Sequence, residues 1–144
     1  MAASILPIGS QTPPAPTRAA GESVTGSARV LLRLEGFAVF AVALAAYAHA
    51  EFSWPAFALL FLVPDLSMLA YLGGRRAGAL GYNLAHTYTF AMVPALVGYA
   101  GGVPAAAAGG LIWIAHIGFD RMLGYGLKYA MGFGDTHLGR IGRP

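Results

Sequence analysis

The chain has 144 residues, of which 57% are apolar and only 10% are charged, whereas soluble domains carry about 25% charged residues. A soluble domain of this size could not bury so much apolar surface, so the composition favours a membrane protein, with the lipid bilayer as its main partner. The absence of cysteine excludes disulfides and thiolate metal sites, and a net charge of +3 without a basic run excludes a typical nucleic-acid binder.

The first predicted segment is a tail over residues 1–28. It contains "SQTPPAPTRAAGESVTGSA", which is rich in Pro, Ser, Thr and Gly and almost free of large apolar residues. Such a composition predicts disorder, because the segment cannot bury enough apolar surface to fold. No basic segment precedes a short apolar core, so we expect no signal peptide here.

Four apolar stretches follow, and each is predicted to be a transmembrane helix. Their boundaries lie at about 30–48, 54–72, 77–100 and 104–127. Each is close to the 20 residues that cross the hydrocarbon core, and none alternates as a barrel strand does. Pro55 and Pro104 suit the first turn of a helix, and paired glycines after the second and third stretches suit helix ends.

The predicted fold class is therefore all-α. We expect a polytopic membrane protein whose four transmembrane helices form one domain over residues 29–129, followed by a C-terminal tail over residues 130–144. Small residues at four-residue spacing, such as Ala106 and Gly110, permit close approach of the helix backbones.

The basic residues predict the orientation of these helices. All nine fall on one side of the four-helix topology: Arg18, Arg29, Arg33, Arg75, Arg76, Arg121, Lys128, Arg140 and Arg143. The two loops on the other side, "HAEFS" and "GGV", contain no Lys or Arg. The positive-inside rule therefore predicts a multi-pass protein of the bacterial inner (cytoplasmic) membrane with both termini in the cytoplasm.

Polar residues inside the predicted spans are few, and they converge on one layer of the bundle. They are Glu35, Asp65, Asn83, His86, His116, Asp120 and Arg121. At about 1.5 Å per residue, three of them fall about 7–9 Å from the cytoplasmic end and three about 12–14 Å from it. His116 and Asp120 are four residues apart and share one helix face. Pro64 should kink the second helix where Asp65 enters, and ionisable residues at this depth indicate a functional site.

The residue types in this layer suit a divalent metal such as zinc, with Asp65, His86, His116 and Asp120 as candidate ligands and candidate catalytic residues. Asp135 and His137 in the C-terminal "GFGDTHLGR" could fold back to complete or cap the site. A metal there could activate water against an ester or phosphoester bond in a lipid. The predicted function is then that of a metal-dependent hydrolase for lipid-like substrates.

Two alternatives stay open. The polar layer could be a closed hydrogen-bonded network of a non-catalytic membrane scaffold, because buried charges need partners whatever else they do. It could also relay protons or ions, which four short helices would do only in a homo-oligomer. Arg121 and Lys128 are interpreted as residues that snorkel to the lipid headgroups, with a specific headgroup site as the alternative.

Several motifs resemble those of a known family. They are "LLRLEG", "FLVPDLSMLAYLGG", "YNLAHTY" and "HIGFDRMLGYGLKY", the last followed by "GFGDTHLGRIG". In order and spacing they are similar to domain-of-unknown-function family 4260, over residues 31–142. The resemblance implies a small bacterial membrane protein with four helices, and it implies no activity.

Overall fold

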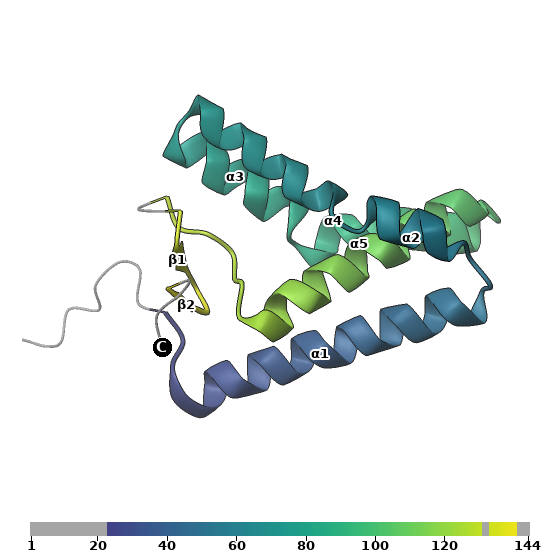
Figure 1. The fold of residues 1–144 in the computed structure, drawn as a ribbon, viewed down its shortest axis with the longest axis horizontal. Coiled ribbons are helices and arrows are strands. Elements are labelled where there is room, and N and C mark those ends of the chain that lie inside the picture. Colours follow the sequence, from purple (N-terminus) through teal and green to yellow (C-terminus); the bar gives the residue numbers. More distant parts are fainter. Residues whose placement is uncertain (1–22, 131–132, 141–144) are drawn as a thin grey trace, which may run out of the picture.

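The computed structural model describes residues 23–130 and 133–140. Residues 1–22 of the predicted N-terminal tail and residues 131–132 and 141–144 of the predicted C-terminal tail lie outside the described residues. Within the described part the chain is helical apart from one short hairpin, which confirms the predicted all-α class (Figure 1).

The elements follow one another with short connections. They are α1 (Gly26–His49), α2 (Trp54–Leu60), the 3₁₀ helix η1 (Val63–Gly73), α3 (Arg75–Ala85), α4 (Tyr88–Ala100), α5 (Pro104–Leu123), β1 (Asp135–Thr136) and β2 (Gly139–Arg140). Helix α1 begins at Gly26, inside the segment predicted as a disordered tail. The first and last predicted spans are each one helix, although α5 ends at Leu123 and not at the predicted residue 127, because Gly124 adopts the left-handed conformation. The second and third predicted spans are each divided in two.

The two divisions have different causes. The second predicted helix, 54–72, stops at Leu60 and resumes as η1 with Pro64 in its first turn. Proline has no backbone N–H and crowds the preceding turn, so this break is the expected effect of Pro64. The third predicted helix, 77–100, breaks at His86 and Thr87, and Thr87 is extended at φ −104° and ψ 135°. No proline or glycine stands at this second break, which was not predicted.

Helix α5 lies at the centre of the bundle, packed against α1 on one side and α4 on the other, while η1 lies along α3 (Figure 1). These helices approach closely because glycines face each neighbour. A Cβ added to Gly118 would lie 2.7 Å from the backbone nitrogen of Phe40, and one added to Gly110 would overlap the backbone of Ala95. By contrast, Gly109 faces open space. Small residues at helix interfaces are typical of membrane bundles.

The connections divide between two ends of the molecule. The start of α1, the η1–α3 junction and the hairpin lie at the left in Figure 1, whereas the α1–α2 and α4–α5 connections lie at the right. Most of the described basic residues belong to the left end, because Arg29 and Arg33 open α1, Arg75 and Arg76 open α3, and Lys128 follows α5.

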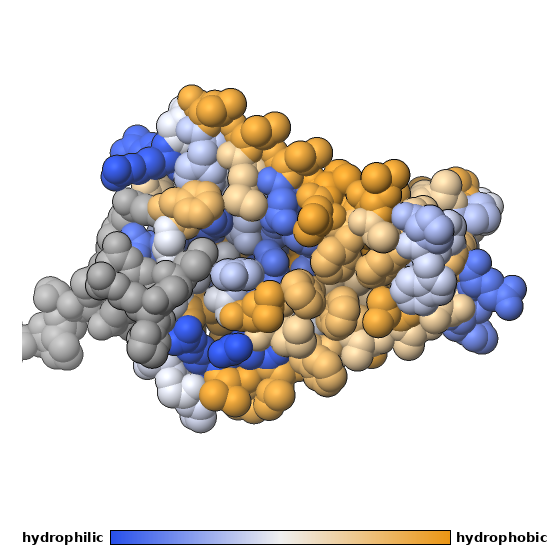
Figure 2. Space-filling model, in the orientation of Figure 1, coloured by the Kyte–Doolittle hydropathy of each residue, from blue (hydrophilic) through white to orange (hydrophobic). Residues whose placement is uncertain are grey.

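Two helical segments, Gly26–His49 and Trp54–Gly73, are long and apolar enough to cross a membrane. Only 17% and 6% of their most apolar windows are buried, so neither is a buried core helix of the kind found in a soluble protein. Figure 2 shows apolar side chains over much of the middle of the molecule and hydrophilic ones at both ends. The outer surface thus carries large apolar side chains along the middle of the molecule.

Candidate metal centre

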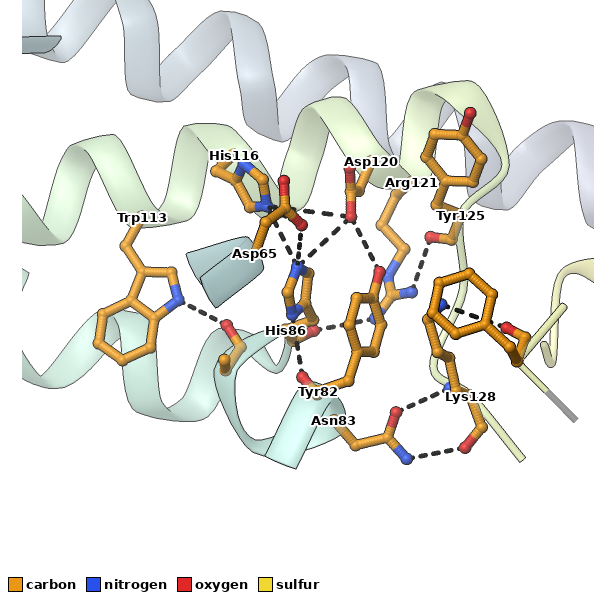
Figure 3. A network of polar contacts seen from close by, with 12 residues as sticks. Asp65, Tyr82, Asn83, His86, Trp113, His116, Asp120, Arg121, Tyr125 and Lys128 are labelled. Atoms are coloured by element: carbon orange, nitrogen blue, oxygen red, sulfur yellow. Dashed lines mark hydrogen bonds and ion pairs between the residues drawn. The ribbon is translucent and has the colours of Figure 1, made fainter. Parts of the chain in front are cut away.

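The structure brings four of the six predicted metal ligands together in the interior of the bundle. Asp65 comes from η1, His86 from the break after α3, and His116 and Asp120 from one face of α5 (Figure 3). One ligand atom from each of these residues lies within 4.8 Å of the others. The spacing of four residues on α5 thus places His116 and Asp120 in one cluster with Asp65 and His86.

The distances within this cluster are those of ligands around one ion. His86 Nε2 lies 3.1 Å from His116 Nε2, 3.3 Å from Asp65 Oδ1 and 3.6 Å from Asp120 Oδ2. His116 Nε2 lies 3.6 Å from Asp65 Oδ1 and 4.0 Å from Asp120 Oδ2. Tetrahedral zinc with bonds of about 2.0–2.2 Å requires ligand atoms about 3.3–3.6 Å apart. Three of the five separations, at 3.3 and 3.6 Å, fall in this range, and the 3.1 Å between the two imidazole nitrogens is also that of a hydrogen bond.

The ring of His86 is oriented by the last turn of α3. Its Nδ1 lies 2.9 Å from the backbone oxygen of Tyr82, and the two rings stack with centroids 3.7 Å apart. A carbonyl oxygen only accepts hydrogen bonds, so Nδ1 carries the hydrogen and the neutral ring presents the lone pair of Nε2 to the cluster. A hydrogen bond from the other ring nitrogen to a carbonyl is the usual support of a metal-binding histidine.

The break beside His86 is stabilised by side chains of α5. Arg121 Nη2 donates to the backbone oxygen of His86 at 3.0 Å, and Trp113 Nε1 donates to that of Ala85. These bonds satisfy carbonyls that the interrupted helix leaves free. Arg121 also donates to the oxygen of Tyr125 at 3.0 Å. The interpretation of Arg121 as a snorkelling residue is therefore wrong, because its guanidinium points inward.

Three hydrogen-bond acceptors and one donor, the Nε2 of His116, meet in this cluster. Ionised Asp65 and Asp120 only accept, His86 Nε2 carries a lone pair, and His116 Nε2 can donate a single hydrogen. Tyr82 donates its hydroxyl to Asp120 Oδ2 at 3.0 Å from outside the cluster. Placing several acceptor atoms next to one another in the interior costs free energy unless a cation or additional protons lie between them. The donor set thus fits a divalent cation.

The carboxylate side of the cluster opens into a cavity. His86 and His116 are each only 1% exposed, whereas Asp65 and Asp120 line a hollow of about 260 Å³ together with Lys128 and several aromatic residues. The side chain of Asp65 is 31% exposed and that of Asp120 is 13% exposed. A small molecule can therefore reach the cluster past the carboxylates and not past the imidazoles.

Lys128 forms part of this cavity wall, which the sequence interpretation missed. Its side chain is 5% exposed, and its Nζ donates to the backbone oxygen of Phe133 at 3.2 Å and lies 4.6 Å from the ring centroid of Tyr82. Burial lowers the pKa of Lys128, and the nearby carboxylates of Asp120 and Asp65 oppose that shift. A residue that snorkels keeps its amine in water, so that interpretation is wrong for Lys128.

Two predicted members of the polar layer lie outside the cluster. Asn83 holds the segment after α5 in place, since its Nδ2 donates to the Lys128 oxygen at 2.9 Å and its Oδ1 accepts from the Lys128 nitrogen at 2.7 Å. Glu35 is exposed on α1 and does not belong to the group of four. Both residues were expected at the depth of the ligands. The side chain of Asn83 instead faces Lys128, and α1, which carries Glu35, contributes no ligand.

The predicted contribution of the C-terminal segment takes another form. Asp135 lies in β1 and His137 in the turn that follows it, and neither is among the four clustered ligands. His137 Nδ1 accepts a hydrogen bond from the backbone nitrogen of Leu127 at 2.8 Å, which fixes the hairpin against the segment leaving α5. Burial, assisted by the charge of Arg121, lowers the pKa of His137. The hairpin therefore supports the segment that forms the cavity wall, and Asp135 and His137 are not part of the group of four ligands.

Tyr82 is a further member of the site that the sequence interpretation missed. It is 3% exposed and contacts both His86, by stacking, and Asp120, by its hydroxyl. A signal was present in the sequence, because Tyr82 precedes His86 by four residues and therefore shares its helix face.

Comparison with known proteins identifies one family. Its model, described as "Domain of unknown function (DUF4260)", matches residues 29–141, which include all of the residues of the cluster. Neither the curated proteins nor the solved structures contain a match to this chain. The matched segment runs from the start of α1 to the end of the hairpin and covers most of the chain. The chain therefore belongs to the DUF4260 family.

Proposed function

We propose that this chain is a four-span protein of the bacterial inner membrane that binds one divalent metal ion and uses it to hydrolyse ester or phosphoester bonds in lipid-like substrates. The observation that carries the proposal is the convergence of four ligand atoms from Asp65, His86, His116 and Asp120 within 4.8 Å of one another. Two imidazoles and one carboxylate are a donor set of catalytic zinc, and they leave a fourth position for water beside the carboxylate of Asp65.

The arrangement of the helices supports the membrane placement. Helix α1 and the α2–η1 segment each have the length and hydropathy of a span, and α3 with α4, followed by α5, run between the same two ends of the molecule (Figure 1). The second span is interrupted after Leu60, shortly before Asp65, and the third is interrupted at His86. Interrupted helices of this kind commonly mark binding sites in membrane proteins.

The basic residues lead to a topological prediction. A reporter that is active only in the cytoplasm is expected to be active when it is fused at either terminus, and silent when it is inserted at residues 50–53 between α1 and α2. The reason is that Lys and Arg gather at the opposite end of the bundle from this loop. Activity of the reporter in this loop is incompatible with four spans and cytoplasmic termini.

The exposure of each ligand suggests which residues bind the ion and which residue transfers the proton. A bound divalent cation lowers the pKa of water and polarises the oxygen of a carbonyl or phosphoryl group. His86, His116 and Asp120 are the more deeply buried ligands, and we assign to them the holding of the ion. Asp65 is the most exposed member and borders the cavity. Its carboxylate is placed to accept the proton of a water whose oxygen bonds to the acyl carbon or phosphorus, and to return it to the departing alcohol.

The hydrolytic function has a direct biochemical consequence. Zinc-loaded protein incubated with a bacterial lipid extract in detergent is expected to release hydrolysis products that mass spectrometry detects. A chelator should abolish the products and added zinc should restore them, because the cation is required at the cluster. If the zinc-loaded protein leaves every lipid intact, the cluster is a structural feature of a non-catalytic membrane protein.

A further inference from the structure

Lys128 places a buried positive charge in the wall of the cavity beside the metal centre. In the described part of the chain, the acceptor found for its Nζ is the Phe133 oxygen, whereas an ammonium group has three hydrogens to donate. Its side chain lines the same cavity as Asp65 and Asp120. A desolvated ammonium is costly without an anion, so the remaining donors favour an anionic group in the cavity.

The charges around the centre become positive when a metal binds. Two carboxylates, those of Asp65 and Asp120, lie near two cations, the buried Lys128 and the half-buried Arg121. Arg121 donates to the backbone oxygens of His86 and Tyr125. A divalent ion held by neutral imidazoles therefore adds two uncompensated positive charges. A phosphate ester, which carries one or two negative charges, matches this excess.

A second cavity lies on the other side of the metal ligands, and η1 contributes residues to both cavities. It has a volume of about 330 Å³ and is almost entirely apolar, with Pro64, Ala85, Gly109 and Trp113 among the lining residues. Pro64 borders this cavity and the next residue, Asp65, borders the polar one. Figure 3 shows Trp113 and Lys128 on opposite sides of the cluster. The two cavities thus offer a polar and an apolar compartment on either side of the metal ligands.

We infer that the metal-loaded centre binds a phosphate-bearing amphiphile, with its phosphate between the ion and Lys128 and its hydrocarbon chain in the apolar cavity. This inference rests on the proposed function and names its substrate class. Lys128 follows α5 at the end of the molecule that carries the basic residues, and the apolar cavity lies further into the bundle. The orientation is that of a phospholipid in the cytoplasmic leaflet, whose headgroup faces the cytoplasm.

Calorimetric titration of three probes tests the inference. Protein in an uncharged maltoside detergent, loaded with one equivalent of Zn²⁺, is titrated with inorganic phosphate, dioctanoyl phosphatidic acid or dioctanoylglycerol. The phosphatidic acid is expected to bind at least about tenfold more tightly than inorganic phosphate, because its chains bury apolar surface in the second cavity. Dioctanoylglycerol, which lacks the anion, is expected to bind most weakly.

Two variants separate the two compartments. Lys128→Met is expected to weaken binding of both phosphate probes by about 30-fold or more, while Lys128→Arg retains most of it, because the lost contact is a desolvated charge. A Cβ at Gly109 meets no atom within 4 Å, so Gly109→Leu fills the apolar cavity without moving the helix. It is expected to weaken phosphatidic acid binding to the level of inorganic phosphate, and Gly109→Ala serves as its control.

The outcomes distinguish this inference from the proposed function. If one Zn²⁺ binds but Lys128→Met and the wild-type protein bind both phosphate probes equally, the ligand assignment is wrong and the metal centre stands. If inorganic phosphate and phosphatidic acid bind with equal affinity, free phosphate and not a lipid occupies the cavity, which overturns the inference. If Zn²⁺ does not bind, both the inference and the proposed function are overturned. A thermal melt of each variant confirms that it is folded.

Discussion

Asp65→Leu is expected to destabilise the zinc-loaded protein by up to about 3 kcal/mol, less than the loss of about 3–5 kcal/mol for breaking a fully buried pair, because the side chain of Asp65 is 31% exposed. Asp65 Oδ1 lies 3.3 Å and 3.6 Å from the two imidazole nitrogens that also face the ion. Leucine removes the negative charge and leaves the cation undercompensated. Asp65→Asn should have a smaller effect, because its amide oxygen can still approach the ion.

The same substitutions should matter much less without metal. In the metal-free protein the carboxylates of Asp65 and Asp120 lie within 4.8 Å of each other, and like charges at that distance repel, so removing one relieves the repulsion. Thermal unfolding in detergent with zinc and with chelator measures the difference. Glu35→Leu replaces an exposed acid on α1 and should stay within about 0.5 kcal/mol in both conditions. Equally small effects of both Asp65 variants in zinc would place Asp65 outside the metal centre.

His116→Leu is expected to weaken zinc binding by more than 100-fold, because removing even an outer partner of a metal ligand costs about 10–100-fold in affinity. The imidazole is sealed in the interior and packs edge-on against Phe61, so leucine can fill its place without changing the fold. Competition with a fluorescent chelator measures the affinity. Asp135→Asn, a change in the hairpin outside the cluster, is the matched control and should bind zinc as the wild type does. Unchanged affinity of His116→Leu would place the ion elsewhere.

Much of the fold could be predicted because it depends on local properties of the chain. Long apolar stretches bounded by proline and glycine predict the helices, and Pro64 predicts the interruption before Asp65. The interruption at His86 could not be predicted in the same way. It depends on the donors that Arg121 and Trp113 supply from α5, more than 25 residues away in the chain. Local sequence at residues 85–87 contains no residue that breaks a helix by itself.

The centre of the candidate site was predictable for a geometric reason. Depth counted along each helix, together with the four-residue spacing of His116 and Asp120, brings acidic and imidazole groups to one point. Depth alone does not say which way a side chain faces around its helix, which is why Glu35 shares the predicted layer and yet lies outside the cluster. The position of Lys128 depends on the turn after α5 and on its pairing with Asn83. Such a contact between distant segments follows from the tertiary fold and not from any local pattern.

The metal content of the purified wild-type protein tests the central claim most directly. Protein isolated in detergent from cells grown with zinc, and dialysed against metal-free buffer, is expected to retain one divalent ion per chain in elemental analysis, because two imidazoles and two carboxylates meet at distances suited to one ion. His116→Leu isolated in parallel should retain none. Folded wild-type protein that holds no stoichiometric metal, and gains no thermal stability from added zinc, manganese or iron, would contradict the account.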